Sequence, residues 1–368
     1  MSEVDRAAVT VRQAEAPTPK PPGGPLRRLR AFFGRHKMLL WWLHSVYALG
    51  LGVLVILFAQ KGFEHARMLA ATLGAAAIVM LIVFRVFGHG AEQKEKVDKS
   101  RGSKIRFHLI TYLLKNLYQP MLFFVLPFYW KSSSLDSING WFIFLLGLLA
   151  FLSTMDVIFD HVLVRYRALA ASYFGLTLFA CLNLVIPALL PNLPTVVPLL
   201  ASALLAVVGF WLLHFPLRTL TLRRSWAILG TVALTFVTLV YLGRAAIPPV
   251  PLYLEHAAVG PERLPDGRLA LEVVTVHTSR LTDLYAVTDV ALPSGEGDAF
   301  RHRWRLRDAA FARDVPTERA PGATPGTLRL TSSLRRADLP AAVAGAWTVD
   351  VLTSDDQLVG RARFVVVE

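Results

Sequence analysis

Cysteine is almost absent from this sequence, since its 368 residues contain only Cys181, which lies inside an apolar run. A single cysteine excludes an intrachain disulfide, a cysteine-rich zinc site and a CxxC redox motif. Charged residues are also scarce at 18%, whereas 54% of the residues are hydrophobic and the mean hydropathy is +0.47. This composition excludes an ordinary soluble protein and predicts a membrane bundle with one further domain.

Catalytic and cofactor signatures are missing too. The sequence has no GxSxG elbow, no P-loop and no recognisable nucleophile paired with a base. The C-terminal third has three histidines without metal-ligand spacing, namely His256, His277 and His302. An alternative cation site consists of Asp156 and Asp160 with His161. We therefore predict no metal and no cofactor, and we favour a protein that is not an enzyme.

The formal net charge of +13 is distributed unevenly. Residues 1–247 contain 25 Lys and Arg against 10 Asp and Glu, whereas residues 248–368 contain 14 against 16. Basic residues next to apolar segments usually report membrane topology. We therefore predict no nucleic-acid partner.

Seven apolar segments each come near the ~20 residues that a bilayer requires. They cover residues 38–60, 68–87, 105–130, 138–164, 168–190, 193–215 and 226–242. If all seven cross the membrane, 20 of the 25 basic residues lie on the same side as the N-terminus, which indicates that this side is cytoplasmic. An odd number of crossings then places the C-terminus in the periplasm. We therefore predict a multi-pass inner-membrane domain at residues 38–246.

Residues 1–37 are predicted to form a disordered cytoplasmic tail, because they are rich in proline, glycine and alanine. The tail ends in a basic segment at residues 26–37 that includes Arg27, Arg28, Arg30, Arg35 and Lys37. Such a segment is attracted to anionic lipid. The alternative interpretation is a plain topological anchor.

The predicted third and fourth spans contain polar residues that helical spacing gathers on one face of each helix. They are His108, Tyr112, Lys115 and Gln119 on the third span, and Ser153, Asp156 and Asp160 on the fourth. Lys115 and Asp156 each lie nine residues from an arginine at the same membrane surface, and are therefore expected at a matching depth of roughly 13 Å. A structural pair that sets helix register and a proton or ion path both remain open.

From residue 252 onward the apolar period changes from that of a helix to that of a strand, after a proline-rich linker at residues 247–251. About seven short strands are expected in residues 252–368, which is typical of an immunoglobulin-like sandwich. One strand face contains Arg301, Arg303, Arg305 and Arg307. This face is a candidate site for an anionic envelope polymer or lipid headgroups; the alternative is a solvated face balanced by acidic residues.

Short motifs in both halves resemble known families. Residues 284–293, His302-Arg303-Trp304, Ser332-Ser333, residues 345–349 and residues 360–367 resemble the bacterial domain of unknown function 2914. Gln119-Pro120, residues 126–130 and residues 152–156 are similar to the family of unknown function 5924. This sequence departs from the pattern of domain 2914 at residues 313–330, where that domain usually has an aromatic-rich region. The resemblance implies a membrane region followed by a β-domain and implies no activity.

These observations predict a seven-helix polytopic membrane bundle followed by an all-β immunoglobulin-like sandwich. The favoured function is an anchor, scaffold or sensor in the inner membrane that presents the sandwich to an envelope protein or glycan. A transporter or proton-coupled protein using Lys115 and Asp156 is the alternative. A membrane-embedded enzyme acting on lipid-linked substrates is the third hypothesis.

Overall fold

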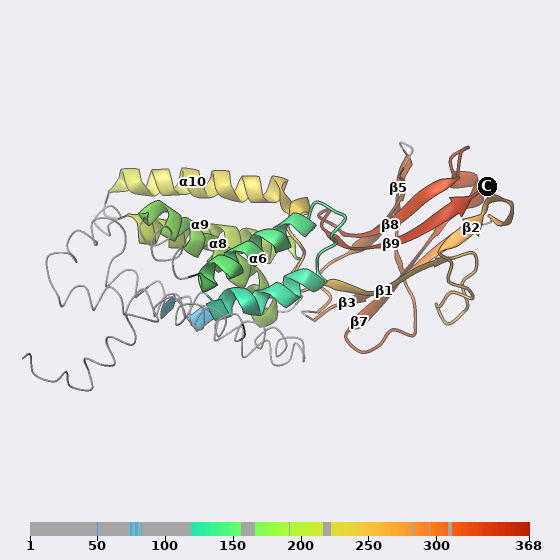
Figure 1. Ribbon diagram of the computed structural model, residues 1–368, viewed down its shortest axis with the longest axis horizontal. Coiled ribbons are helices and arrows are strands. Elements are labelled where there is room, and N and C mark those ends of the chain that lie inside the picture. The colour runs from blue at the N-terminus through green and yellow to red at the C-terminus, as the bar shows by residue number, and fades with distance from the viewer. Residues whose placement is uncertain are drawn as a thin grey trace, which may run out of the picture. The chain divides into compact units, whose positions relative to one another are not determined.

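The computed structural model describes residues 119–155, 166–190, 192–215 and 222–368, apart from 282, 294 and 308–310, and a few isolated positions between 50 and 82. The predicted tail and first two spans therefore lie outside the described residues, apart from those isolated positions. So do His108, Tyr112, Lys115, Asp156 and Asp160. The described chain forms a group of helices followed by two β-sheets (Figure 1).

The helices are apolar over most of their length. Residues 119–131 are helical, and they are followed by α6 (Gly140–Thr154), α8 (Arg167–Leu189), α9 (Val196–His214) and α10 (Arg223–Leu242). The buried faces of residues 119–131, α6 and α8 share a core that includes Tyr129, Leu146, Phe174 and Leu184. Residues of α9 and α10 are buried in two smaller clusters. The Tyr129 hydroxyl donates to the Ala180 carbonyl of α8 at 3.2 Å. Burial of large apolar side chains is therefore what holds this group together.

The predicted seven-helix membrane bundle is wrong. Among the described residues only two helices, Ala168–Leu189 and Arg223–Leu242, are long and apolar enough to cross a membrane. The 15-residue helix α6 rises about 22 Å, which is less than the roughly 30 Å of a bilayer core. Hydropathy alone does not distinguish an apolar helix that packs inside a protein from one that crosses a bilayer. The prediction failed for this reason.

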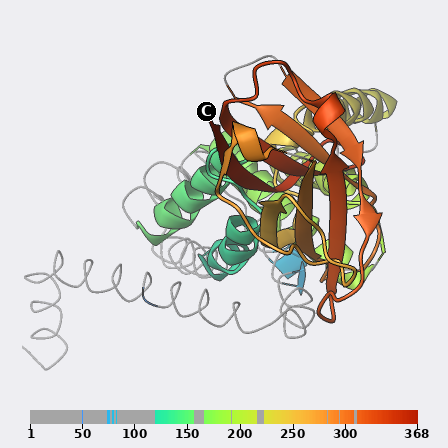
Figure 2. The ribbon, with the colours of Figure 1, turned by 90° about the vertical axis from the view of Figure 1, so that its right-hand side faces the viewer.

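Nine strands form two sheets in the described C-terminal part. The four-stranded sheet has the order β1-β3-β7-β6 and the five-stranded sheet the order β2-β9-β8-β4-β5. Their bounds are β1 (Tyr253–Gly260), β2 (Thr275–His277), β3 (Leu284–Ala291), β4 (Phe300–Leu306), β5 (Phe311–Pro316), β6 (Glu318–Arg319), β7 (Thr327–Leu334), β8 (Gly345–Thr353) and β9 (Leu358–Val367). Figure 2 shows these strands facing the viewer. The neighbouring pairs are antiparallel except for β2 with β9.

The two sheets pack face to face over a common core. Trp304, Trp347 and Phe364 of the five-stranded sheet are buried together with Leu284 and Leu334 of the four-stranded sheet. The rings of Trp347 and Phe364 stack with centroids 5.9 Å apart. β5 and β6 were not expected from the sequence, because most of their residues are exposed and give no alternating apolar pattern. We call this double layer the β-sandwich.

Several polar contacts join the helices to the β-sandwich. The Asn139 side chain, just before α6, donates to the Leu358 carbonyl at 3.0 Å, and the Gln357 amide donates to the Ile247 carbonyl at 3.2 Å. The Glu296 N–H donates at 3.0 Å to the side chain of Asn192, which lies between α8 and α9. Residues 247–251, predicted as a linker, contribute Val250 to the buried core of the helices. The β-sandwich is therefore held against the helix ends by several separate loops.

Candidate functional site

The outer surface of the five-stranded sheet has a concentration of arginines, because β4 alternates inward apolar and outward basic residues. His302, Trp304 and Leu306 are buried between the sheets. Arg301, Arg303 and Arg305 lie on the other face of the strand, where they form ion pairs with aspartates. Two further strands contribute to this surface, with Asp350 on β8, and Arg361 and Arg363 on β9. We call this surface the arginine face.

One row across the sheet alternates in charge from strand to strand. The register places Asp314 of β5 opposite Arg303 of β4, Arg303 opposite Asp350 of β8, and Asp350 opposite Arg361 of β9. Arg303 donates to both oxygens of Asp314, and Arg361 donates to both oxygens of Asp350. Directly opposed unlike charges stabilise a sheet, so this row neutralises itself.

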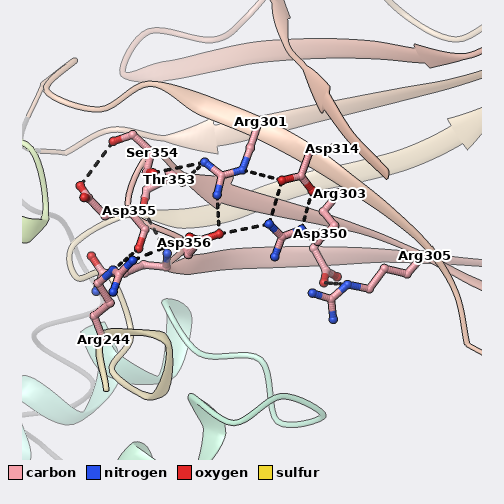
Figure 3. A network of polar contacts seen from close by, with 11 residues as sticks. Arg244, Arg301, Arg303, Arg305, Asp314, Asp350, Thr353, Ser354, Asp355 and Asp356 are labelled. Carbon is pink, nitrogen blue, oxygen red and sulfur yellow. Dashed lines mark hydrogen bonds and ion pairs between the residues drawn. The ribbon is translucent and has the colours of Figure 1, made fainter. Parts of the chain in front are cut away.

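The turn between β8 and β9 contributes a further carboxylate. Arg301 and Arg303 both donate to Asp356, and Arg301 also donates to the carbonyls of Thr353 and Ser354 at 3.2 Å. Arg244, just after α10, donates to the Asp355 carbonyl at 2.5 Å and forms an ion pair with Asp356. Figure 3 shows these side chains converging on the turn. The network therefore connects the end of α10 to the arginine face.

Carboxylates and guanidiniums shift one another's pKa in this network. The hydrogen bond from Arg303 lowers the pKa of Asp314, and the same bond raises the pKa of Arg303. For Asp136, burial raises the pKa but the hydrogen bond and charge of Arg361 outweigh it, so that the pKa is lowered. These three groups therefore remain charged over the ordinary pH range.

Two cavities lie side by side on the arginine face, and Asp136, Arg305 and Arg361 line both. One, of about 660 Å³, also contacts Ser137, Ile138 and Ala245 of the helical part. The other, of about 700 Å³, is lined by Arg307 and Arg363 as well. Together they form a groove that begins at the helix ends and runs over the sheet. Such a groove, with convergent polar groups, is the default location for a binding site.

The structure describes two residues of the predicted intramembrane cluster, Gln119 and Ser153, and both are buried. The Ser153 hydroxyl donates to the Ala150 carbonyl of its own helix at 2.6 Å. Of the predicted arginine strand, Arg307 lies just beyond the end of β4, where its N–H donates to the Ala346 carbonyl at 2.8 Å. Arg361 and Arg363 were not predicted, although the alternation of Arg361-Ala362-Arg363-Phe364 was a usable signal.

A second polar group, also missed from the sequence, lies inside the β-sandwich. His302 Nδ1 is 2.7 Å from the Ser332 hydroxyl and His302 Nε2 is 2.9 Å from the Thr288 hydroxyl. The Trp304 indole N–H donates to Ser332 at 3.2 Å. Burial lowers the pKa of His302 to about 3. Because His302 has no exposed surface, this serine–histidine pair has no access to a substrate and serves to join the two sheets.

The other two histidines of the β-sandwich are separate from each other. His256 contacts Glu272 at 2.9 Å, and His277 contacts the Ser279 hydroxyl at 2.8 Å. Within the part of the chain that the structure describes, no group of three or more His, Cys, Asp or Glu could hold a metal ion. The guanidiniums of the arginine face provide paired N–H donors that suit anionic groups.

Comparison with known proteins shows the family of this chain. No curated protein matches it. Among solved structures, the Pseudomonas fluorescens alkylpurine DNA glycosylase AlkC bound to DNA containing an abasic site analog is 11% identical, with 81% of this chain and 98% of that chain covered; its TM-score of 0.22 is too low to support any argument. The profile of a family described as "Family of unknown function (DUF5924)" matches residues 26–286. This chain therefore belongs to the family of unknown function DUF5924.

Proposed function

We propose that this protein is an anchor of the inner membrane whose helices hold the β-sandwich, with its arginine face, toward an anionic partner in the bacterial cell envelope. The observation that supports this proposal most strongly is the uncovered apolar surface of α10. Only 17% of its most apolar window is buried. Leu234 is 70% exposed and Leu242 is 68% exposed. Apolar surface of this extent is typical of a membrane or protein interaction site.

A second helix supports the same proposal. In α6, Trp141, Phe144, Leu148 and Phe151 follow helical spacing, and all are exposed. Trp141 is 75% exposed and lies one residue after the first residue of α6, close to Asn139, whose side chain contacts the β-sandwich. Tryptophan is enriched where a membrane meets water. We therefore propose that the membrane surface lies at the helix ends that contact the β-sandwich.

The flanking charges support an extracytoplasmic β-sandwich. Three arginines lie at residues 218–224, around the start of α10, whereas Arg244 follows its end. Arg167 is the first residue of α8, at the end away from the contact between Asn192 and Glu296, and Arg165 precedes it by two residues in the sequence. Basic residues remain preferentially in the cytoplasm. We therefore propose a periplasmic location for the β-sandwich.

The joined loops favour a scaffold in which the arginine face has a fixed orientation. Contacts from Asn139, Asn192, Thr195 and Arg244 reach four separate positions of the β-sandwich. Separating the β-sandwich from the helices would require breaking the hydrogen bonds of several loops together, which costs more free energy than bending one flexible linker. A partner bound at the arginine face would therefore be held at a defined distance from the helices.

Membrane anchoring can be tested by alkaline extraction of cell membranes. Leu234 lies near the middle of α10, where an arginine costs about 2.5–3.5 kcal/mol in a bilayer. We expect the parent protein to remain in the membrane pellet and the Leu234→Arg variant to be depleted from it. Val274→Arg is the matched control, because Val274 is an equally exposed apolar residue of the β-sandwich, at 76%. It should leave the pellet fraction unchanged.

Extraction of the parent protein into the supernatant would refute the anchor. Equal depletion by the two arginine substitutions would also refute it, because Val274 lies outside the helices. The binding part of the proposal is tested separately, by recovering envelope glycan or protein on the full-length chain and comparing it with the Arg305→Gln variant. Recovery that is unchanged in this variant would contradict a role for the arginine face.

A further inference from the structure

The row of the sheet next to the self-neutralising row has a different composition. In this second row, Arg305 of β4 lies opposite Ala312 of β5 and Thr348 of β8, and Thr348 lies opposite Arg363 of β9. Two arginines therefore lie on either side of one threonine in the sheet, and the row itself contains no carboxylate. With neighbouring strands about 4.8 Å apart, the backbones of Arg305 and Arg363 are roughly 10 Å apart, which long side chains can span from both sides.

The arginines of this row have weaker or fewer ion-pair contacts, and more exposed side chains, than Arg303 of the first row. Arg305 has one long contact, 3.8 Å from its Nε to Asp350, and Arg363 has an ion pair with Asp136. Their side chains are 44% and 62% exposed, whereas that of Arg303 is 23% exposed. A guanidinium has five N–H donors. Arg305 and Arg363 therefore keep donors directed to solvent in the groove.

The adjoining cavity of about 700 Å³ has a local excess of positive charge. Among the described residues that line it are four guanidiniums, those of Arg305, Arg307, Arg361 and Arg363, and the carboxylate of Asp136; of the four, Arg361 is already paired with Asp350. Residues 248–368 as a whole have two more acidic than basic residues. The positive charge is therefore concentrated here and is not a property of the entire β-sandwich. A local field of this sign attracts anions to the groove.

We propose that Arg305, Thr348 and Arg363 form a binding site for a phosphate group. Arginine matches a tetrahedral oxyanion with paired N–H donors, whereas lysine presents a point charge. No lysine occurs after Lys131, so every basic side chain of the β-sandwich other than histidine has this geometry. Thr348 lies between the two arginines in the sheet, and its hydroxyl provides an uncharged donor. This site rests on the proposed function, because it specifies where on the arginine face an anionic partner would bind.

The position of the site relates it to the membrane surface. Asp136, which pairs with Arg361 and Arg363, lies four residues before the first residue of α6. Under the proposed anchoring, the groove opens next to the lipid headgroups. The phosphate could thus come from an anionic lipid or from a soluble envelope molecule, and the chemistry of recognition is the same. An experiment can separate these two sources.

The site is tested by titrating purified full-length protein with inorganic pyrophosphate, with unfolding temperature and calorimetry as readouts. We expect Arg305→Gln and Arg363→Gln each to weaken binding by about tenfold, because each removes charge-assisted hydrogen bonds. Thr348→Val keeps the shape and charge and should weaken binding by roughly threefold. These readouts do not require a membrane, so failure of the anchor and failure of the site give different results.

Arg319→Gln is the matched control. Its side chain is 62% exposed, as is that of Arg363, and it too forms one ion pair with an acid, Glu296. The control should bind pyrophosphate within twofold of the parent protein. Equal weakening by Arg319→Gln and Arg363→Gln would overturn the site in favour of general charge attraction. Absence of measurable binding by the parent protein would also overturn it.

The source of the phosphate is assigned by reconstitution in nanodiscs. Competition by a lipid headgroup predicts weaker pyrophosphate binding in nanodiscs containing phosphatidylglycerol than in those of phosphatidylcholine alone. Arg363→Gln should abolish this difference. Affinity that is equal in the two lipids, with the arginine variants still weakened, assigns the site to a soluble phosphate ligand.

Discussion

Asp298, between β3 and β4, accepts hydrogen bonds from the backbone N–H and the hydroxyl of Thr195, the residue before α9, although the two are 103 residues apart in the sequence. The backbone N–H lies 3.2 and 3.1 Å from the two carboxylate oxygens. A carboxylate at a helix N-terminus is favoured by the helix dipole. Burial nevertheless raises the pKa of Asp298 to about 6, so desolvation outweighs these contacts.

The contact between Asp298 and Thr195 predicts a specific pH dependence. The pKa of Asp298 is higher in the folded protein than the value of 3.8 expected after unfolding, so the folded state binds the proton more readily between about pH 4 and pH 6. Stability from this group therefore falls as pH rises through that window, by at most about 3 kcal/mol. Asp298→Asn should abolish this dependence and should be more stable than the parent above pH 6, as measured by chemical unfolding followed by tryptophan fluorescence.

The control is Glu296→Gln, because Glu296 is only two residues away and is exposed. The stability of this variant should depend on pH as that of the parent does. An Asp298→Asn variant that is less stable than the parent at pH 7.5 would contradict the prediction.

His302 is expected to act in the opposite direction. Its pKa of about 3 in the folded protein lies below the ordinary value of 6.5, so only the unfolded chain gains a proton as pH falls through this range. Stability is full above about pH 6.5 and declines toward pH 3, by up to about 5 kcal/mol. His302→Gln should flatten this acid limb in urea unfolding curves. At pH 7 it should cost about 1–3 kcal/mol because partners in the core are left unsatisfied. An acid limb that is equally steep in the variant would show that other groups cause it.

Arg361 is predicted to stabilise the folded β-sandwich by neutralising a buried carboxylate. It donates to both oxygens of Asp350, whose side chain is 3% exposed. Arg361→Ala would leave a buried carboxylate with only the distant Arg305, which should destabilise the protein by about 3 kcal/mol. Arg319→Ala breaks an exposed pair instead and should cost less than about 1 kcal/mol. Chemical unfolding of both variants checks the contrast, and similar losses of stability would contradict it.

The proposed topology can be checked with introduced cysteines, because Cys181, the sole cysteine, is buried. Val274→Cys on the β-sandwich should react with a membrane-impermeant maleimide once the outer membrane alone is permeable. Tyr166→Cys, just before α8, should react only after the inner membrane is opened. The opposite order of labelling would place the β-sandwich in the cytoplasm.

The arginine strand illustrates what local pattern predicts well. A strand alternates its side chains between two faces whatever its neighbours are, so the outward arginines at positions 301, 303 and 305 were predictable from their spacing alone. Their partners were not. Asp314, Asp350 and Asp356 lie 11 to 55 residues along the chain from the arginines that they contact, and only strand register and the turn before β9 bring them together.

The sequence by itself determined where helical periodicity gives way to strand periodicity, and it determined the alternating faces of the strands, because both depend on residues close together in the chain. Tertiary structure alone decided which apolar helices are buried and which are exposed, since α8 and α10 are similarly apolar but 67% and 17% buried in their most apolar windows. It also decided that two of the arginines, Arg305 and Arg363, retain donors in a groove while Arg303 is neutralised. Burial and charge compensation depend on distant segments packing together, and a linear pattern does not contain that information.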